Sequence, residues 1–175
     1  MYGRAALGDL TLNTPSAAAT SPAPHLYTRT ATVQDAESVH QIYCGAPKYF
    51  EILSAPLPTL PEVERELEVA AQDPKRCAKL LLEGEEAIGY LDYKLDYPEA
   101  QDATVNLILI PESLQSHGYG RRAMALLETE LQGRAKRVLA SIYGNNGRAK
   151  RFWRSLGYRF AIDARPILEW YAKEL

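Results

Sequence analysis

The sequence predicts a single α/β domain in which a mixed central sheet of six to seven strands is flanked by about four helices. Apolar segments of strand length alternate with segments whose apolar residues recur at helical spacing. The chain has 175 residues, a length typical of one domain with one core. Its residues are 46% hydrophobic and 24% charged, which excludes collagen-like and wholly disordered chains.

The first 24 residues differ from the rest of the chain. They carry only two charged side chains, Arg4 and Asp9, and end in a stretch of Ala, Ser, Thr and Pro. Such a segment buries little apolar surface to offset its ordering entropy. We therefore expect residues 1–24 to form a flexible or loosely packed leader and residues 25–175 to form the domain.

Regular elements begin with a strand over His25–Ala31. Thr32 and Asp35 resemble a capping box, which predicts that a helix begins here. Its apolar face is formed by Ala36, Val39, Ile42 and Tyr43.

Prolines interrupt the next part of the chain and limit Lys48–Leu53 to a short helix. Thr59 and Glu62 then cap a helix that runs to about Gln72.

Two strands, Cys77–Leu82 and Ala87–Leu95, are joined by a turn that contains Gly84. Thr104–Ile110 is almost entirely apolar, as expected for a central strand. A helix over Tyr119–Gln132 follows, and the glycine at position 133 ends it.

The last part of the chain predicts a strand at Arg137–Tyr143 and a helix at Asn146–Leu156 that ends at Gly157. Two strands, Tyr158–Ala164 and Ile167–Ala172, complete the sheet. The exposed edge of these last strands offers a surface through which a homodimer could form.

Composition excludes several function classes. The net charge of −2 does not indicate a nucleic-acid-binding surface. No apolar run approaches the ~20 residues of a membrane span, and the N-terminus lacks the pattern of a signal peptide. Cys44 and Cys77 are expected to be unpaired, buried or partly buried thiols in a reducing cytoplasm. His25 and His40 have no partners at metal-ligand spacing, so no metal site is predicted.

The charge is unevenly distributed. Residues 33–100 contain 14 acidic and 6 basic side chains, whereas residues 121–159 contain 10 basic and 2 acidic ones. The second region would favour a phosphate ligand, and the first a cationic substrate.

The segment Gln115–Arg122 lies between the central strand and its helix and contains Gly118 and Gly120. Free amides at the start of a helix, together with the helix dipole, make an anion site. The glycines also fit the dinucleotide fingerprint G-x-G-x-x-A. However, seven residues separate them from the strand, and no acidic residue follows at the required distance. A phosphate or pyrophosphate ligand is therefore favoured over a nicotinamide cofactor.

Two motifs together resemble the GNAT superfamily of N-acetyltransferases. The first is Q-x-x-G-x-G, here Gln115 to Gly120, between a central strand and a helix. The second is Asn146 to Tyr158, which resembles the helix motif N-x-x-A-x-x-[LF]-[YW]-x-x-x-G-[FY]. The resemblance covers the chain from about Leu26 to the C-terminus, and it implies acetyl-CoA as co-substrate and an amine as acceptor.

The resemblance implies a role for each matching residue. The amides of Gln115, Ser116, His117, Gly118, Tyr119 and Gly120 would hold the pyrophosphate of coenzyme A. The strand from Leu107 to Ile110 would pair with the pantetheine arm, and the amide of Ile108 would stabilise the oxyanion. Asn146, or Asn145 in a shifted register, would bind pantetheine beside Trp153. Candidates for the 3′-phosphate are Arg121, Arg148, Lys150 and Arg151.

Both usual catalytic side chains of the family are missing. A Glu on the central strand is replaced by Thr104, and we expect Asp102 to act as the base, with Asp92 and Asp96 as further candidates. The usual Tyr that protonates the leaving thiolate is replaced by Trp153, and Tyr143 is the candidate substitute.

The prediction is therefore a cytoplasmic acyl-CoA-dependent N-acyltransferase that acts on a small amine or a protein amine. A cationic acceptor is suggested by the acidic, tyrosine-rich first half, with Pro47–Phe50 in the acceptor wall. The alternative is a catalytically weak or silent acyl-CoA-binding module. An enzyme that acts on charged tRNA is a lesser variant.

Overall fold

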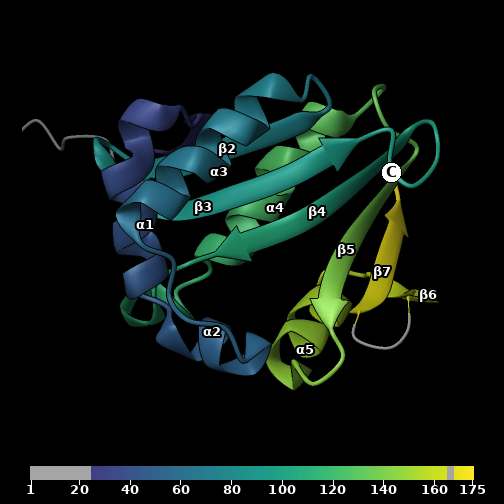
Figure 1. The fold of residues 1–175 in the computed structure, drawn as a ribbon. Helices are drawn as coiled ribbons and strands as arrows, with labels where there is room; N and C mark the ends of the chain where they lie inside the picture. The colour runs from purple at the N-terminus through teal and green to yellow at the C-terminus, as the bar shows by residue number, and fades with distance from the viewer. Residues whose placement is uncertain (1–24, 165–167) are drawn as a thin grey trace, which may run out of the picture.

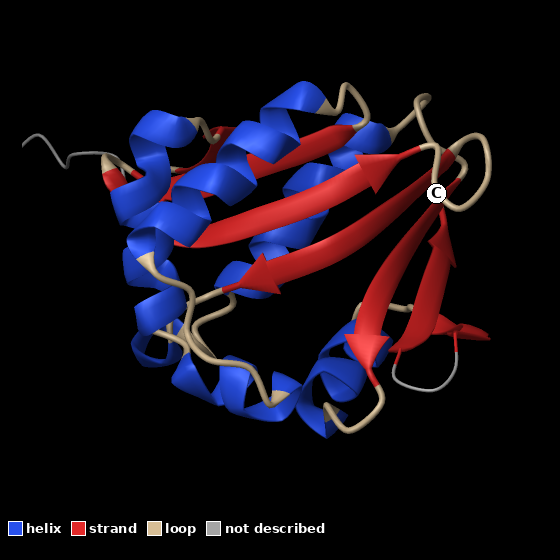
Figure 2. Ribbon diagram, in the orientation of Figure 1, coloured by secondary structure: helices blue, strands red, loops and turns tan. Residues whose placement is uncertain are grey.

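The computed structural model describes residues 25–164 and 168–175. The expected leader, residues 1–24, and the start of the predicted last strand lie outside this described part. The described elements form one seven-stranded sheet with helices on both of its faces, as Figures 1 and 2 show. The predicted α/β class and mixed sheet are confirmed, with five α-helices where about four were expected.

The sheet has the strand order β1-β2-β3-β4-β5-β7-β6. Among the described strands, only the β4–β5 pair is parallel, and all other neighbours are antiparallel. The strands are β1 (Leu26–Thr30), β2 (Arg76–Glu83), β3 (Glu86–Leu95), β4 (Asp102–Leu109), β5 (Arg137–Tyr143), β6 (Arg159–Ala164) and β7 (Leu168–Glu174).

The helices divide between the two faces (Figure 1). Helices α1 to α3 share a core with alternate side chains of β2 and β3, and α4 packs on the opposite face. Helix α5 contacts β5. The helices are α1 (Ala36–Cys44), α2 (Pro47–Leu53), α3 (Leu60–Gln72), α4 (Tyr119–Leu131) and α5 (Gly147–Ser155), with 3-10 turns η1 (Val33–Asp35) and η2 (Glu112–Leu114).

Local signals set the ends of these helices. The amide of Thr32 donates to Asp35 Oδ2 at 2.8 Å, and the amide of Thr59 donates to Glu62 Oε2 at 2.7 Å. Both predicted capping boxes are therefore confirmed. Gly133 and Gly157 follow their helices with φ of 76° and 89°, which only glycine adopts without strain.

Strands β4 and β5 are paired over only part of their length. The register runs from Asp102 opposite Arg137 to Val105 opposite Ala140, and then the pairing stops. Beyond this point the two strands diverge, and α2 and α5 lie at the open side (Figure 2). The diverging strands leave one edge of β4 without a partner in the middle of the sheet.

Both cysteines are unpaired, as predicted, although Cys44 is exposed rather than buried. Within the described ranges, no helix is both long enough and apolar enough to cross a membrane.

Candidate functional site

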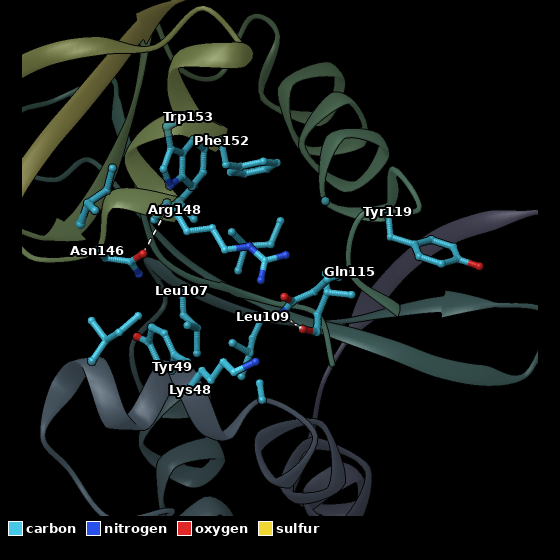
Figure 3. A pocket seen from close by; sticks show the side chains of 18 of the residues that line it. Lys48, Tyr49, Leu107, Leu109, Gln115, Tyr119, Asn146, Arg148, Phe152 and Trp153 are labelled. Atoms are coloured by element: carbon cyan, nitrogen blue, oxygen red, sulfur yellow. Dashed lines mark hydrogen bonds between the residues drawn. The ribbon is translucent and has the colours of Figure 1, made fainter. Parts of the chain in front are cut away.

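A cavity of about 430 Å³ lies between the diverging strands. Its walls come from β4, β5, α2, α5 and the loop before α4 (Figure 3). We call the end at residues 115–121 the loop end, and the end at Val105, Asn106 and Ser141 the apex. The cavity therefore connects the predicted anion site with the point where the strands separate.

The loop end presents a row of backbone amides. Residues 116–121 donate no amide hydrogen bond to any described residue. Gly118 enters α4 with φ of 83°, and a Cβ on Gly120 would lie 3.2 Å from the ring of Phe152. Glycine at these two positions lets the loop turn and lets α4 approach α5 closely. The free amides and the positive end of the α4 dipole form an anion site.

Basic side chains surround this loop. Lys48, Arg121 and Arg148 line the cavity, and the guanidinium of Arg148 points into it (Figure 3). Among the described residues, Arg148 forms no salt bridge. The single acidic lining residue, Glu112, pairs with Lys48 Nζ at 3.1 Å and accepts from the Lys48 amide at 3.0 Å. These hydrogen bonds lower the pKa of the Glu112 carboxyl.

Aromatic and amide side chains form the middle of the cavity. Trp153 is buried, with its ring centroid 5.2 Å from Phe152 and 4.8 Å from Tyr158. Burial, and to a lesser degree the neighbouring phenol of Tyr143, raise the pKa of Tyr49 to about 12. Tyr49 on α2 and Tyr143 on β5 thus place two neighbouring phenols in the cavity wall.

Asn146 serves as the cap of α5. Its Oδ1 accepts from the amide of Ala149 at 2.9 Å. Because Oδ1 is used in this way, Nδ2 remains as the donor that the side chain can offer to a ligand.

A buried polar network stands behind the apex. Asp92 is 2% exposed and accepts from Arg76 Nε at 2.7 Å and from Asn106 Nδ2 at 2.7 Å. Arg76 Nη2 also bonds Glu66 at 3.1 Å, which in turn accepts from Tyr43 Oη at 3.1 Å. Burial raises the pKa of Glu66. One guanidinium is thus shared by two carboxylates.

Most of the predicted site residues line this cavity. They are Ile108, Ile110, Gln115, Ser116, Gly118, Tyr119, Gly120, Arg121, Tyr143, Asn146 and Trp153.

Two of these residues use their side chains elsewhere. The side-chain Nε2 of Gln115 donates to the carbonyl of Ile110 at 2.7 Å, and its backbone amide donates to the carbonyl of Glu112. The Tyr119 ring turns away from the cavity, where its hydroxyl bonds Glu83 at 2.6 Å (Figure 3).

Several predicted residues do not line the cavity, namely Asp92, Asp96, Asp102, His117, Asn145, Lys150 and Arg151. Asp102 begins β4 at the paired end of the strand, and Arg137 binds both of its oxygens at 3.0 and 2.6 Å. The Asp102 carboxylate is thus engaged in an ion pair, and its assignment as the base stays a prediction. Lys150 pairs with Glu169 at 2.8 Å, and His117 Nδ1 lies 2.9 Å from the carbonyl of Gln115. Their expected contacts with coenzyme A stay predictions.

The acidic half of the chain does not supply an acidic cavity wall. None of its carboxylates lines the cavity, because several are used in ion pairs on the α3 face or at the sheet edge. Asp96 pairs with Lys75 at 3.5 Å. Of its tyrosines, only Tyr49 reaches the cavity, and Tyr43, Tyr90 and Tyr93 are buried in the core.

Asn106, Ser141, Glu112 and Phe152 also line the cavity and were not predicted from the sequence. Asn106 carries no carboxylate and therefore was not a candidate base. The sequence nevertheless marks Asn106, because it is the one amide side chain within an otherwise apolar run. Among the described residues, no group of three or more His, Cys, Asp or Glu side chains could hold a metal ion.

Comparisons with known proteins assign the family. The acetyltransferase (GNAT) family profile matches residues 37–158. An acetyltransferase from Thermus thermophilus is 42% identical, with a TM-score of 0.83 over 86% of this chain and 97% of that chain. No curated protein sequence matches significantly.

Two more distant structures share the fold. An acetyltransferase from Salmonella typhimurium that modifies the N-terminal serine of ribosomal protein L7/L12 is 16% identical, with a TM-score of 0.74. The aminoglycoside acetyltransferase AAC(6')-Ib in complex with coenzyme A is 15% identical, with a TM-score of 0.72. Each comparison covers 86% of this chain and 95% of the other. The family profile and the Thermus relative show that the chain belongs to the acetyltransferase (GNAT) family and is an acetyl-CoA-dependent acetyltransferase.

Proposed function

We propose that the enzyme transfers an acetyl or other short acyl group from acyl-CoA to a primary amine, on a small molecule or a protein, in a ternary complex. The observation that carries this proposal is the continuous cavity from the α4 anion site to the apex between β4 and β5. A cofactor with a phosphate at one end and a thioester at the other matches such a cavity.

Coenzyme A would lie along the unpaired edge of β4. Its pyrophosphate would bind the free amides of residues 116–121, supported by the positive charges of Lys48, Arg121 and Arg148. The pantetheine arm would follow Leu107–Ile110 and accept a hydrogen bond from Asn146 Nδ2. This orientation places the thioester at the apex, where the amide of Ile108 is our candidate for stabilising the oxyanion.

The reaction is direct aminolysis of a thioester. The amine nitrogen bonds to the carbonyl carbon, the C–S bond breaks, and the amine gives one proton to solvent. The leaving sulfur takes up one proton, so the products are the N-acylated amine and free coenzyme A. Tyr143 lines the cavity and is our candidate for the hydroxyl that gives this proton and regains one from solvent, since the indole of Trp153 does not release one.

Ligand binding and turnover test the proposal separately. At 100 times its Kd, acetyl-CoA should stabilise the fold by ~2.7 kcal/mol, and the Tm should rise by several degrees. NAD serves as the matched control and should give no shift. Thiol release with a panel of amines should then be saturable in both substrates. No shift of the Tm with acetyl-CoA would overturn the proposed binding of coenzyme A in the cavity. A shift without thiol release would favour the catalytically silent acyl-CoA-binding module.

A further inference from the structure

Asn106 occupies an irregular position at the apex. On β4, Leu107 pairs with Asp92 and Val105 pairs with Tyr93, so the residue between them has no partner on β3. The pairing with β5 also ends at Val105. Such a bulge redirects a side chain. Here it places Asn106 in the cavity lining, where it is exposed.

The buried carboxylate fixes the orientation of the Asn106 amide. An ionised carboxylate only accepts hydrogen bonds, so the group that lies 2.7 Å from Asp92 must be the NH₂ of Asn106. The amide oxygen is the other terminus of the side chain, and no described residue donates to it. Asn106 therefore offers the cavity a hydrogen-bond acceptor, its Oδ1, beside the second N–H of its NH₂ group.

The other oxygen of Asp92 also has a partner. Arg76 Nε donates to its second oxygen at 2.7 Å. The same guanidinium also serves Glu66, so two carboxylates face one positive charge. An excess of negative charge in a region of low dielectric attracts a positive or partly positive group at the apex.

We propose that Asn106 Oδ1 accepts an N–H of the acceptor amine and turns the nitrogen lone pair toward the thioester, and that Asp92 is a positioning residue that acts through Asn106. This inference rests on the proposed function. Asn106 takes up no proton, because a side-chain amide is not a base at neutral pH. The role it fills is recognition and orientation of the nucleophile.

The variant Asn106→Leu tests the contact, because leucine has a similar size and accepts no hydrogen bond. Loss of one hydrogen bond to the amine should lower kcat/KM for the amine by about 10- to 100-fold. The Kd of acetyl-CoA should stay within about twofold, since Asn106 is not at the loop end. An unchanged kcat/KM for the amine would overturn the inference.

A double-mutant cycle separates positioning from structure. Asp92→Asn removes the constraint on the orientation of the Asn106 amide, because an amide at position 92 can accept from or donate to Asn106. This variant alone should lower kcat/KM for the amine by about as much as Asn106→Leu. In the Asn106→Leu background it should cost nothing further, because Asp92 acts through the missing group. Losses that multiply would show a structural role only and overturn the positioning role.

The matched control is Asp73→Asn, which removes a carboxylate outside the cavity lining. The Asp73 carboxylate pairs with Lys94 at 2.8 Å. It should leave kcat/KM unchanged. Failure of this inference is distinguishable from failure of the proposed function. If the wild-type enzyme acetylates amines and Asn106→Leu does so equally well, only the inference fails. If the wild-type enzyme releases no thiol with any amine, the proposed function fails and the inference falls with it.

Discussion

At the loop end of the cavity, positive charge is exposed and comes from many weak sources. Six unpartnered amides, the α4 dipole and three basic side chains all face solvent or the cavity. At the apex, the charge is negative, buried and concentrated in one network behind Asn106. A polyanionic cofactor is suited to the first kind of site, because distributed charge tolerates a flexible ligand. A single reacting nitrogen needs the second kind, because only a fixed group sets its direction.

The comparison also predicts where substitutions cost stability and where they cost affinity. Groups at the loop end are exposed, so their loss leaves no buried charge behind. Behind the apex, Asp92 is buried, Arg76 and Glu66 are partly buried, and the three groups depend on one another.

Arg76→Met should destabilise the fold most. It leaves Asp92, which is 2% exposed, without its cationic partner. Removing one member of a buried ion pair costs about 3 kcal/mol, which lowers the Tm by roughly 6 to 12 °C. Chemical denaturation measures the effect. Lys94→Met is the control, because its partner Asp73 is a third exposed and the pair is worth under about 1 kcal/mol. Equal losses in the two variants would contradict the contrast between the two regions.

Arg148→Glu should mainly affect cofactor affinity. The reversal places a negative charge beside the site proposed for the pyrophosphate, and the Kd of acetyl-CoA should rise by about 10- to 100-fold. Titration calorimetry measures this change. Arg154→Glu changes the same charge on the same helix at an exposed position outside the cavity lining. If this control weakens binding as much, the effect of Arg148 is long-range and not local.

The two ends should also differ in how pH affects stability. Glu66 has a raised pKa when folded, so the native state binds more protons than the unfolded state above pH ~4.3. Its contribution to stability is lost as pH rises toward the folded pKa. Glu112 has a lowered pKa, so its contribution is present above pH ~4.3 and is lost as pH falls.

The variants Glu66→Gln and Glu112→Gln test these opposite slopes. Glu66→Gln should reduce the fall in unfolding free energy as pH increases above ~4.3. Glu112→Gln should reduce the gain in unfolding free energy as pH increases toward ~4.3. Urea denaturation at a series of pH values measures both slopes. Changes of the same sign in the two variants would show that the two carboxyls do not differ as described.

The sequence predicted the strands and helices well because each has a local cause. Capping at Thr32 and Thr59, the glycine after α4 and the apolar run in β4 act within a few residues. The surroundings of the acid–base candidates could not be predicted in this way, because they depend on partners distant in the chain. Asp102 is separated from Arg137 by 35 positions, and its burial in that ion pair has no local signal.

The position of the apex along β4 could not be predicted from the sequence either. Alternation correctly relates residues two apart, but it does not say where β4 leaves β5 or where a bulge interrupts the count. Both events fall at Asn106. The residue at the apex therefore could not be identified from spacing alone, although a polar amide in an apolar strand marked it.

Lys48→Met should have the smallest effect on stability and is the sharpest test of exposed charge at the loop end. Its ammonium pairs with Glu112 at 3.1 Å, but the side chain is 72% exposed, so the unfolding free energy should change by less than about 0.5 kcal/mol. The backbone bond from its amide to Glu112 remains and keeps α2 in place.

The Kd of acetyl-CoA for Lys48→Met should rise two- to fivefold at low salt. This difference should shrink at high salt, because the Debye length, over which charges are screened, falls from about 10 Å to about 3 Å. Lys75→Met, an exposed pair with Asp96 outside the cavity, should leave the Kd unchanged at both salt concentrations. A salt-independent loss for Lys48→Met would instead mean that the lysine makes a direct, desolvated contact with the cofactor.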